Sequence, residues 1–215
     1  MRTDLPRLGI PTASNFHWIC TQEGRRGDSR ERRAYLHRLV YEKITGEKAK
    51  EKFQGNEYTE DGINNEEPAA RALSLKLGVE LLPGCFITTK DGRFGCSPDR
   101  FIRGRHEGVE IKAPAGWTHI GFMIDGPGNK YKPQVQGQLL VSGFDRMHFW
   151  SWNPNPLLKP VYIEVMRDGE YIRKLRGYLD EFAEDLDKAE SYVRRAGNLD
   201  ELELHLTEAG EIYLQ

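Results

Sequence analysis

Apolar residues recur at intervals of three and four positions in several stretches, a pattern typical of helices with one buried face. The longest such stretch, 170–195, predicts a long amphipathic helix. An earlier helix is predicted to begin at the capping-box-like pair Asp28 and Glu31 and to end at Gly46. Further helices are predicted over 12–20, from about Asn65 to Gly78 with Pro68 in the first turn, and over 133–143.

Between these helices the apolar period shortens to two, which predicts β-strands. The run Lys90-Asp91-Gly92 is a hairpin signal. Residues 113–130 are rich in glycine and proline and are predicted to form a long loop. Strands are predicted over 79–88, 93–96, 99–103, 108–112, 147–152 and 161–167.

This order of elements predicts an α/β (α+β) fold in which helices flank a central mixed sheet. The 215 residues are enough for one sizeable core, and we expect a single domain over 1–195. The tail 196–215 places leucines between acids, so we expect either an interface element or a frayed end.

Composition narrows the class of protein. The formal net charge of −2 argues against a polybasic tail, although 25–38 is locally basic. The 3 cysteines lack the spacing of a zinc or iron–sulfur site. No apolar run approaches the roughly 20 residues that span a bilayer. No signal peptide opens the sequence, so we expect an intracellular protein without a membrane partner.

Candidate chemistry gathers where Asp99 precedes a strand that carries Glu110 and Lys112 on one face. If the strands are neighbours, two carboxylates and an ammonium group converge. Magnesium takes one or two carboxylates and keeps several waters, and the carbonyl of Ile111 would add a ligand. Such a site suits attack of water on a phosphodiester. The competing interpretation is a common turn followed by a solvated acid–lysine pair.

The residues Asp99 and Glu110-Ile111-Lys112 resemble the PD-(D/E)xK nuclease motif. Together with the blocks around them, they resemble the lambda exonuclease, or YqaJ-type viral recombinase, family. The resemblance extends from about Arg7 to the helix ending near Arg195 and implies a restriction-endonuclease-like core. The five blocks, in the family's order, are 7–14 (RLGIPTAS), 62–66 (GINNE), 96–99 (CSPD), 110–114 (EIKAP) and 131–136 (YKPQVQ).

The resemblance implies a role for each matching residue at the metal. Asp99, Glu110 and Glu66 are expected to bind the metal together with the backbone carbonyl of Ile111. Lys112 is expected to act on the attacking water. For Glu66 the competing interpretation is an acid favoured by the start of a helix, which applies equally to its neighbour.

Two glutamines fall in the family's Gln-x-Gln helix. Residues two apart on a helix do not share a face, so we expect one of Gln134 and Gln136 to reach the active site. The resemblance favours Gln134 as the catalytic one. Gln138 shares the face of Gln134. A purely structural role is equally open for Gln136 and Gln138.

The family keeps a pocket for a terminal 5′-phosphate, and three residues stand at matching positions: Arg7, Ser14 and Ser97. A guanidinium group with hydroxyls at a helix start suits a phosphate. The competing interpretations are a surface charge for Arg7 and a helix cap for Ser14.

Other residues are expected to contact DNA. Arg25 and Arg26 occupy the loop where the family uses an arginine to track DNA. Tyr58 stands near the family's strand-separating wedge, where an aromatic ring would stack on a base. Tyr131 and Gln136 are expected to line the same cleft.

The resemblance therefore implies a Mg²⁺-dependent 5′-to-3′ exonuclease of double-stranded DNA, with Mn²⁺ as a substitute metal. Such an enzyme releases 5′-mononucleotides and leaves 3′ single strands for phage-type homologous recombination. It further implies a homotrimeric ring on duplex ends, a single-strand annealing protein as partner, and a phage or prophage protein in the bacterial cytoplasm. The alternatives are a structure- or site-specific endonuclease on the same fold and a catalytically inactive DNA-binding module.

Overall fold

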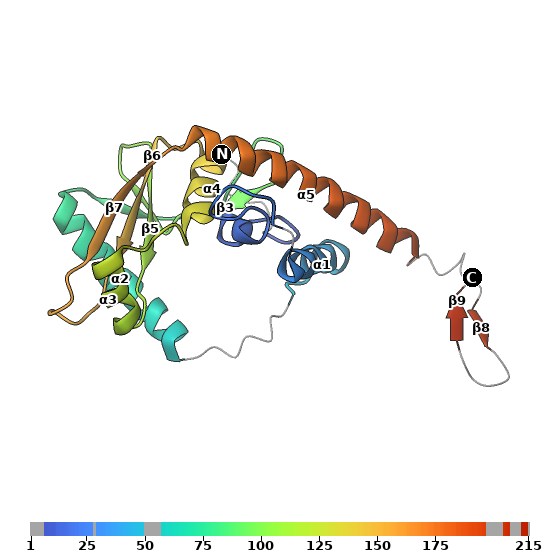
Figure 1. Cartoon of the computed structure of the whole chain (residues 1–215), viewed down its shortest axis with the longest axis horizontal. Coiled ribbons are helices and arrows are strands. Elements are labelled where there is room, and N and C mark those ends of the chain that lie inside the picture. Colours follow the sequence, from blue (N-terminus) through green and yellow to red (C-terminus); the bar gives the residue numbers. More distant parts are fainter. Residues whose placement is uncertain (1–6, 28, 50–56, 197–203, 207–211, 215) are drawn as a thin grey trace.

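A five-stranded mixed sheet forms the centre of the protein, in the strand order β1-β4-β5-β6-β7 (Figure 1). The computed structural model describes residues 7–27, 29–49, 57–196, 204–206 and 212–214. β5 and β6 pair in parallel, whereas the other neighbours in this sheet are antiparallel. The five strands are β1 Leu81–Pro83, β4 Arg100–Ile102, β5 Glu107–Lys112, β6 Arg146–Ser151 and β7 Val161–Met166. The predicted mixed α/β architecture is thus confirmed.

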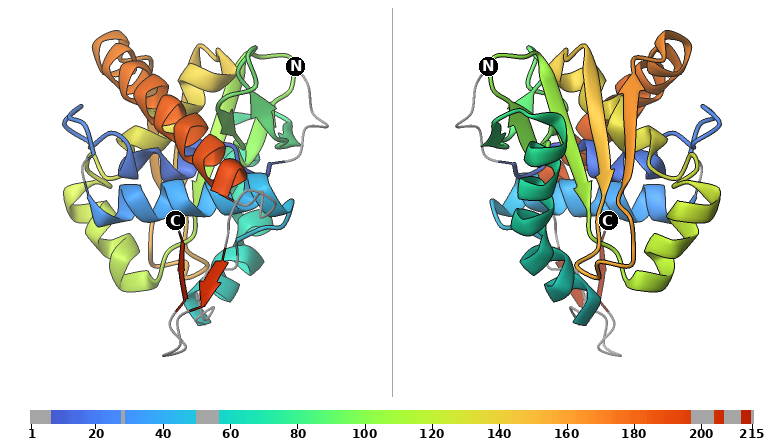
Figure 2. Two further views of the ribbon diagram at one scale, coloured as in Figure 1. Left: turned by 90° about the vertical axis from the view of Figure 1, so that its right-hand side faces the viewer. Right: turned by 90° about the vertical axis from the view of Figure 1, so that its left-hand side faces the viewer.

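Helices cover both faces of this sheet (Figure 2). α2 packs on β5 and β6 from one face, and α4 packs on β6 from the other. α1 and α5 lie against each other on the α4 side. The helices are η1 Ala13–Trp18 (a 3₁₀-helix), α1 Arg30–Thr45, α2 Glu57–Leu77, α3 Gly116–Asp125, α4 Lys132–Ser142 and α5 Gly169–Ala196. Among the described residues, no helix is both long and apolar enough to cross a membrane.

Two short antiparallel hairpins accompany the main sheet. β2 Ile87–Thr88 pairs with β3 Gly95–Cys96, and β8 Leu204–Leu206 pairs with β9 Ile212–Leu214. The first hairpin turns through Gly92, which adopts a positive φ of 73°. The predicted turn at 90–92 is therefore confirmed.

The two faces of β5 serve different purposes. Val109 and Ile111 are buried against α2, in a core that also contains Leu73 and Trp150. Side chains alternate along a strand, so Glu110 points to the opposite face, where α4 lies. The chain therefore places the acid of its central motif between the sheet and α4.

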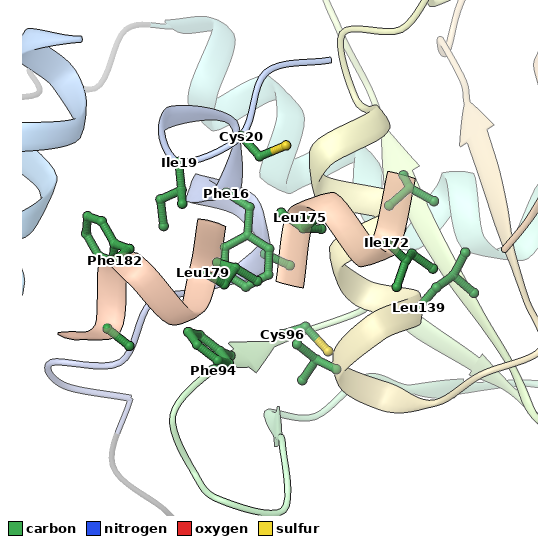
Figure 3. Packing of buried hydrophobic residues seen from close by; sticks show 14 of the residues in the cluster. Phe16, Ile19, Cys20, Phe94, Cys96, Leu139, Ile172, Leu175, Leu179 and Phe182 are labelled. Atoms are coloured by element: carbon green, nitrogen blue, oxygen red, sulfur yellow. The ribbon is translucent and has the colours of Figure 1, made fainter. Parts of the chain in front are cut away.

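A larger core forms where η1, β3, α4 and α5 meet (Figure 3). Phe16, Phe94, Leu175 and Phe182 are completely buried there. Burying a side chain of this size stabilises the fold by roughly 1.5–3 kcal/mol. A Cβ at Gly137 of α4 would overlap the ring of Phe16, so glycine lets η1 rest directly on the α4 backbone.

Several predicted elements differ from the structure at their boundaries. α2 begins at Glu57 instead of Asn65, so Gly62 and Pro68 lie inside the helix. Proline removes one N–H from the helical ladder, and packing of the buried residues Ala69 and Leu73 on the sheet offsets that loss.

The prediction of a loop over 113–130 is wrong in its middle, because this stretch contains α3. Its glycines and prolines stand mostly outside the helix, for example Pro114 before it and Gly126 directly after it. His119 and Phe122 are buried at helical spacing. The glycine and proline residues near the ends of the helix led to the prediction of a loop, although the residues between them form a helix with a buried face.

Two further predictions need correction. The cap of α1 is Ser29, whose hydroxyl accepts a hydrogen bond from the backbone N–H of Arg32 (3.2 Å), whereas Asp28 lies outside the described residues. The predicted strand over 79–88 is broken into β1 and β2, and Gly84 lies in the break.

Gly84 generates a prediction about stability. A Cβ at this position would overlap the carbonyl oxygen of Pro98, next to Asp99. We expect Gly84→Ala to lower the free energy of unfolding by about 1–3 kcal/mol, because rigid backbone must move to make room. Urea denaturation would measure the change.

The matched control is Gly177→Ala in α5, where an added Cβ meets no atom within 4 Å. Alanine there should raise the free energy of unfolding by roughly 0.5–1 kcal/mol, since glycine is a poor helix former. Equal stability of the two variants would contradict the close approach at Gly84.

Candidate active site

Asp99 precedes β4 and is held by β5. Its backbone N–H donates to the carbonyl of Val109 (2.9 Å). Its Oδ2 accepts a hydrogen bond from the backbone N–H of Ile111 (2.6 Å). The predicted adjacency of the two strands is therefore confirmed, and the register of the sheet fixes where this carboxylate lies.

Glu110 is almost completely buried, with 2% of its surface exposed. Lys112 Nζ and Gln134 Nε2 each donate to its Oε1 at 2.5 Å, and Gln138 Nε2 donates to its Oε2 at 2.5 Å. The two glutamines are one turn apart on α4 and point the same way. A buried carboxylate is costly unless it is paired and hydrogen-bonded, and these three donors meet that need.

Gln136 points away from this cluster. Its Nε2 donates to the carbonyl of Met166 and its Oε1 accepts from the backbone N–H of Asp168, both at 2.9 Å. The residue is 3% exposed, and its contact with DNA stays a prediction. Of the two glutamines, Gln134 is the one that reaches the carboxylate of Glu110, and its catalytic role stays a prediction. The spacing of four residues was the signal that Gln138 accompanies it.

Lys112 lies between Glu110 and an aromatic wall. Its Nζ is 5.2 Å from the ring centre of Tyr131, which in turn packs against Phe149. Burial works against the charged form of Lys112, but the charge and hydrogen bond of Glu110, with the charge of Asp99, raise the pKa of this amine overall. The side chain is therefore a cation and a hydrogen-bond donor near neutral pH.

The pKa of Asp99 is raised into the neutral range. Burial and the neighbouring charge of Glu110 raise its pKa from 3.8 to about 7, although the Ile111 N–H and Lys112 act in the opposite direction. Two carboxylates share a buried place with one lysine. A second cation beside Lys112 would offset the repulsion between the two carboxylates and stabilise their charged forms.

The donor set fits a divalent metal of the magnesium type. Among the described residues no group of three His, Cys, Asp or Glu side chains is close enough to hold a metal. Glu66 is bonded to Arg100 Nη1 (2.6 Å) instead of joining Asp99 and Glu110. Magnesium needs only one or two carboxylates, and both candidates supply the hard oxygen atoms it prefers.

Arg7 and Ser14, two of the residues predicted to bind a 5′-phosphate, line one cavity of about 1040 Å³. The third residue, Ser97, does not line that cavity, although it follows β3, whose Gly95 forms a bridge with Thr12 beside the pocket. Their roles as phosphate ligands stay predictions.

Sequence reasoning missed Arg38 of α1, which lines the same cavity. Its guanidinium carbon lies 4.7 Å from the ring centre of Trp18 and 5.3 Å from that of Tyr35. Two aromatic faces thus orient a cation that lines the cavity with Arg7 and Ser14. No sequence motif identifies this residue. Its position three residues after Tyr35 in the same helix indicates only that the two side chains lie close together.

Three further residues are predicted to contact DNA: Arg25, Arg26 and Tyr58. Arg25 is exposed in the loop before α1. Arg26 forms an ion pair with Glu181 of α5 (3.1 Å). Tyr58 belongs to α2, but its side chain lies outside what the structure describes. The three assignments stay predictions.

The fold is shared with structures of exonucleases. An alkaline exonuclease from Laribacter hongkongensis matches with a TM-score of 0.79 and 24% identity, over 89% of this chain and 94% of that one. Its structure in complex with dAMP matches with the same TM-score and coverage at 25% identity. A phage-related exonuclease from Haemophilus somnus 129PT matches with a TM-score of 0.67 and 17% identity, over 86% and 96% of the two chains.

The sequence places the chain in a family. No curated protein matches it significantly. Residues 5–145 match the YqaJ-like viral recombinase domain. The match covers more than half of the chain, and the protein belongs to the YqaJ-like viral recombinase family.

The raised pKa of Asp99 generates a prediction for the metal-free protein. The folded-state pKa of about 7 exceeds the unfolded value, so the folded state binds more protons and the stability contribution of Asp99 falls as pH rises toward 7. Asp99→Asn removes this penalty. In EDTA, its gain in unfolding free energy should be about 1–2 kcal/mol larger at pH 8 than at pH 5.5.

Chemical denaturation at the two pH values would measure this difference. Asp125→Asn, which removes an exposed carboxylate at the end of α3, is the matched control and should show no such increase. A gain from Asp99→Asn that is equal at both pH values would contradict the raised pKa that burial and the charge of Glu110 give to Asp99.

Proposed function

We propose that the protein is a Mg²⁺-dependent 5′-to-3′ exonuclease of double-stranded DNA that releases 5′-mononucleotides and leaves a 3′ single strand. Mn²⁺ is expected to replace Mg²⁺. The observation that carries the proposal is the convergence of Asp99, Glu110 and Lys112 on adjacent strands, in a member of a viral recombinase family. The dAMP bound to the Laribacter exonuclease belongs to the class of product that this reaction would release.

Each residue of the cluster has a role in this proposal. Asp99 and Glu110 would hold the metal, with the carbonyl of Ile111 and the carboxylate of Glu66. When bound, the metal supplies an activated water and neutralises charge that develops on the phosphate. Lys112, protonated near neutral pH, donates a hydrogen bond to the attacking water or to the phosphate oxygens and so stabilises developing negative charge.

The glutamines of α4 orient the reacting groups. Gln134 and Gln138 donate to the two oxygens of Glu110, which prevents this carboxylate from rotating. Tyr131 holds the aromatic wall beside Lys112. A site on rigid elements of this kind keeps the reacting groups in place without reorganisation.

The cavity lined by Arg7 and Ser14 is proposed to bind the terminal 5′-phosphate, together with Ser97 and Arg38. Guanidinium groups bind phosphate through paired, charge-assisted hydrogen bonds. A pocket for a chain end explains why the enzyme would act on ends. Beyond this pocket, Arg25, Arg26 and Tyr58 are proposed to contact the DNA.

The biological setting follows from the same proposal. The enzyme would act on duplex ends as a homotrimeric ring, with a single-strand annealing protein that receives the 3′ strand. It would serve phage-type recombination in the bacterial cytoplasm.

Polarity is the first property to test. A long linear duplex carrying separate labels at its 5′ and 3′ ends would be digested with Mg²⁺, beside a covalently closed circle. We expect early loss of the 5′ label and an intact circle, because chemistry begins at a 5′ end. The variant Lys112→Ala should abolish digestion.

Other outcomes of this assay identify the competing functions. Cleavage of the closed circle would replace the exonuclease with an endonuclease on the same fold. Binding without cleavage of either substrate would indicate an inactive DNA-binding module, and early loss of the 3′ label would reverse the proposed polarity.

The phosphate pocket generates a second prediction. Removing the 5′-phosphate from the linear duplex should slow digestion roughly tenfold or more, because the charged hydrogen bonds to this group contribute about 1.5–3 kcal/mol. Arg7→Ala should erase the difference between phosphorylated and dephosphorylated ends, whereas Arg105→Ala, exposed between β4 and β5, should preserve it. Equal initial rates of the unmodified protein on the two ends would refute the assignment.

A further inference from the structure

α3 has two apolar faces, and the described part of the protein covers only the inner one. His119 and Phe122 are buried on that inner face. Trp117 and Ile124 are each 75% exposed, and Ile120 is 42% exposed. Residues three, four and seven apart share one side of a helix, so these exposed side chains form a single outer face. α3 lies at the periphery of the molecule in both views of Figure 2, which leaves the outer face open to solvent.

The inner face fixes α3 beside the carboxylate cluster. The Nε2 of His119 donates to a backbone carbonyl between β6 and β7 at 3.0 Å, and its Nδ1 lies 2.8 Å from the hydroxyl of Ser151. Ser151 pairs with Lys112 in the register of β5 and β6. Phe122 meets Tyr131 edge to face, with 6.0 Å between ring centres, and Tyr131 is the ring beside Lys112. The outer face therefore belongs to a firmly held helix next to the site.

Gly121 lies in the middle of the outer face, between Trp117 and Ile124. A Cβ at this position would meet no atom within 4 Å, so the packing of the protein does not require glycine here. Glycine in a helix is less favourable than alanine, which has the next smallest side chain. Its effect is a flat gap beside the indole ring. A planar group can approach the ring closely across this gap.

The charges around the outer face favour a polyanion over a second apolar protein surface. The surrounding segments 113–131 and 152–160 contain one acid, Asp125, in a chain with 33 acids. Lys130 and Lys159 are exposed at the border of the face. The carbonyl of Lys159 accepts a hydrogen bond from the inner face of α3, and Lys130 Nζ lies 5.5 Å from the centre of the tyrosine ring that the helix packs on.

We propose that the outer face of α3 is a stacking platform for unpaired bases of DNA, with Trp117 as its principal contact. This inference rests on the proposed function, because an enzyme that digests one strand of a duplex produces bases without partners. Every base has a flat π-face that stacks on an aromatic ring, while nearby cations bind the phosphates. Trp117 follows Lys112 by five residues, so a base on the platform would lie close to the site of cleavage.

The test is the binding of an oligothymidylate with a 5′-hydroxyl to the full chain in EDTA. EDTA prevents cleavage, and the missing 5′-phosphate removes the proposed phosphate pocket from the measurement. Because Trp18, Trp150 and Trp152 are more buried than Trp117, we expect the oligonucleotide to quench mainly the fluorescence of Trp117. The variant Trp117→Phe should lose this quenching.

Affinity is measured separately, by the fluorescence anisotropy of a labelled oligothymidylate. We expect Trp117→Ala to raise the Kd about tenfold or more, as is typical for the loss of a ring that stacks on a base. Trp117→Phe keeps an aromatic ring and should bind more tightly than Trp117→Ala. Leu75→Ala is the matched control, because Leu75 of α2 is an apolar residue of similar exposure (85%), and it should keep the Kd of the unmodified protein.

An abasic oligonucleotide distinguishes stacking from attraction to phosphate. It keeps the phosphates but has no bases, so the unmodified protein and Trp117→Ala should bind it with the same low affinity. If Trp117→Ala weakened binding of the abasic and the normal oligonucleotide by the same factor, Trp117 would not stack on bases, and the inference would be overturned.

Gly121→Ala separates the role of the flat gap from the stability of the fold. Alanine should raise the thermal midpoint of unfolding by roughly 1–4 °C, since it is the better helix former and has open space. The same methyl group should weaken oligothymidylate binding about two- to fivefold, because a small gap between stacked groups removes much of their attraction. Unchanged or tighter binding would overturn the close approach on which the platform depends.

Two further outcomes separate this inference from the proposed function. Equal affinity of Trp117→Ala and the unmodified protein for oligothymidylate would overturn the platform and leave the exonuclease intact. If that variant instead lost a concentration-dependent association seen by sedimentation, the outer face would be a contact between copies of this chain. Binding that depends on Trp117, in a protein that digests no DNA end with Mg²⁺, would support the platform and overturn the proposed exonuclease.

Discussion

The structure depends on giving the buried carboxylate of Glu110 enough polar partners. Burying such a group costs several kcal/mol unless partners compensate for the lost water. Lys112 supplies an opposite charge, and Gln134 and Gln138 supply amide donors from α4. Because the amides come from one helix, α4 cannot rotate on the sheet without leaving a buried charge unpaired. The packing of α4 and the chemistry of the site are therefore a single constraint.

The two faces of β5, the strand that carries Glu110, pack against different helices. Its apolar side chains, Val109 and Ile111, anchor α2, while its polar ones face α4. The apolar face gives β5 the stability that permits an unfavourable arrangement on the other face, where Asp99 and Glu110 repel each other. Active sites commonly contain groups that lower the stability of the fold because the reaction requires them.

The sequence predicts the centre of this site for a physical reason. A period of two along 108–112 fixes which side chains share a face, and a short connection places Asp99 beside that strand. The orientation of Gln136 required the structure, because helical spacing separates Gln134 from Gln136 but does not say which one reaches Glu110. Arg100 was harder still, since its partners come from α2, whose placement no local pattern reveals.

The errors in secondary structure have a common cause. Glycine and proline predict irregular chain around α3, but most of them lie at the ends of that helix. They also predict a late start for α2, but there they lie inside the helix. Tertiary packing decided both: His119 and Phe122 bury one face of α3, and Ala69 and Leu73 bury one face of α2.

The contact between Gly137 and Phe16 fixes how closely η1 and α4 pack. Because Gly137 has no side chain, the ring of Phe16 and the methyl group of Ala13 rest directly on the backbone of α4, the helix that also carries Gln134. The spacing between η1, which carries Ser14, and α4 is consequently set on the α4 side by main-chain atoms, which have no rotamer to change. The distance between these two elements therefore depends on backbone geometry and close packing, and not on a flexible side chain of α4.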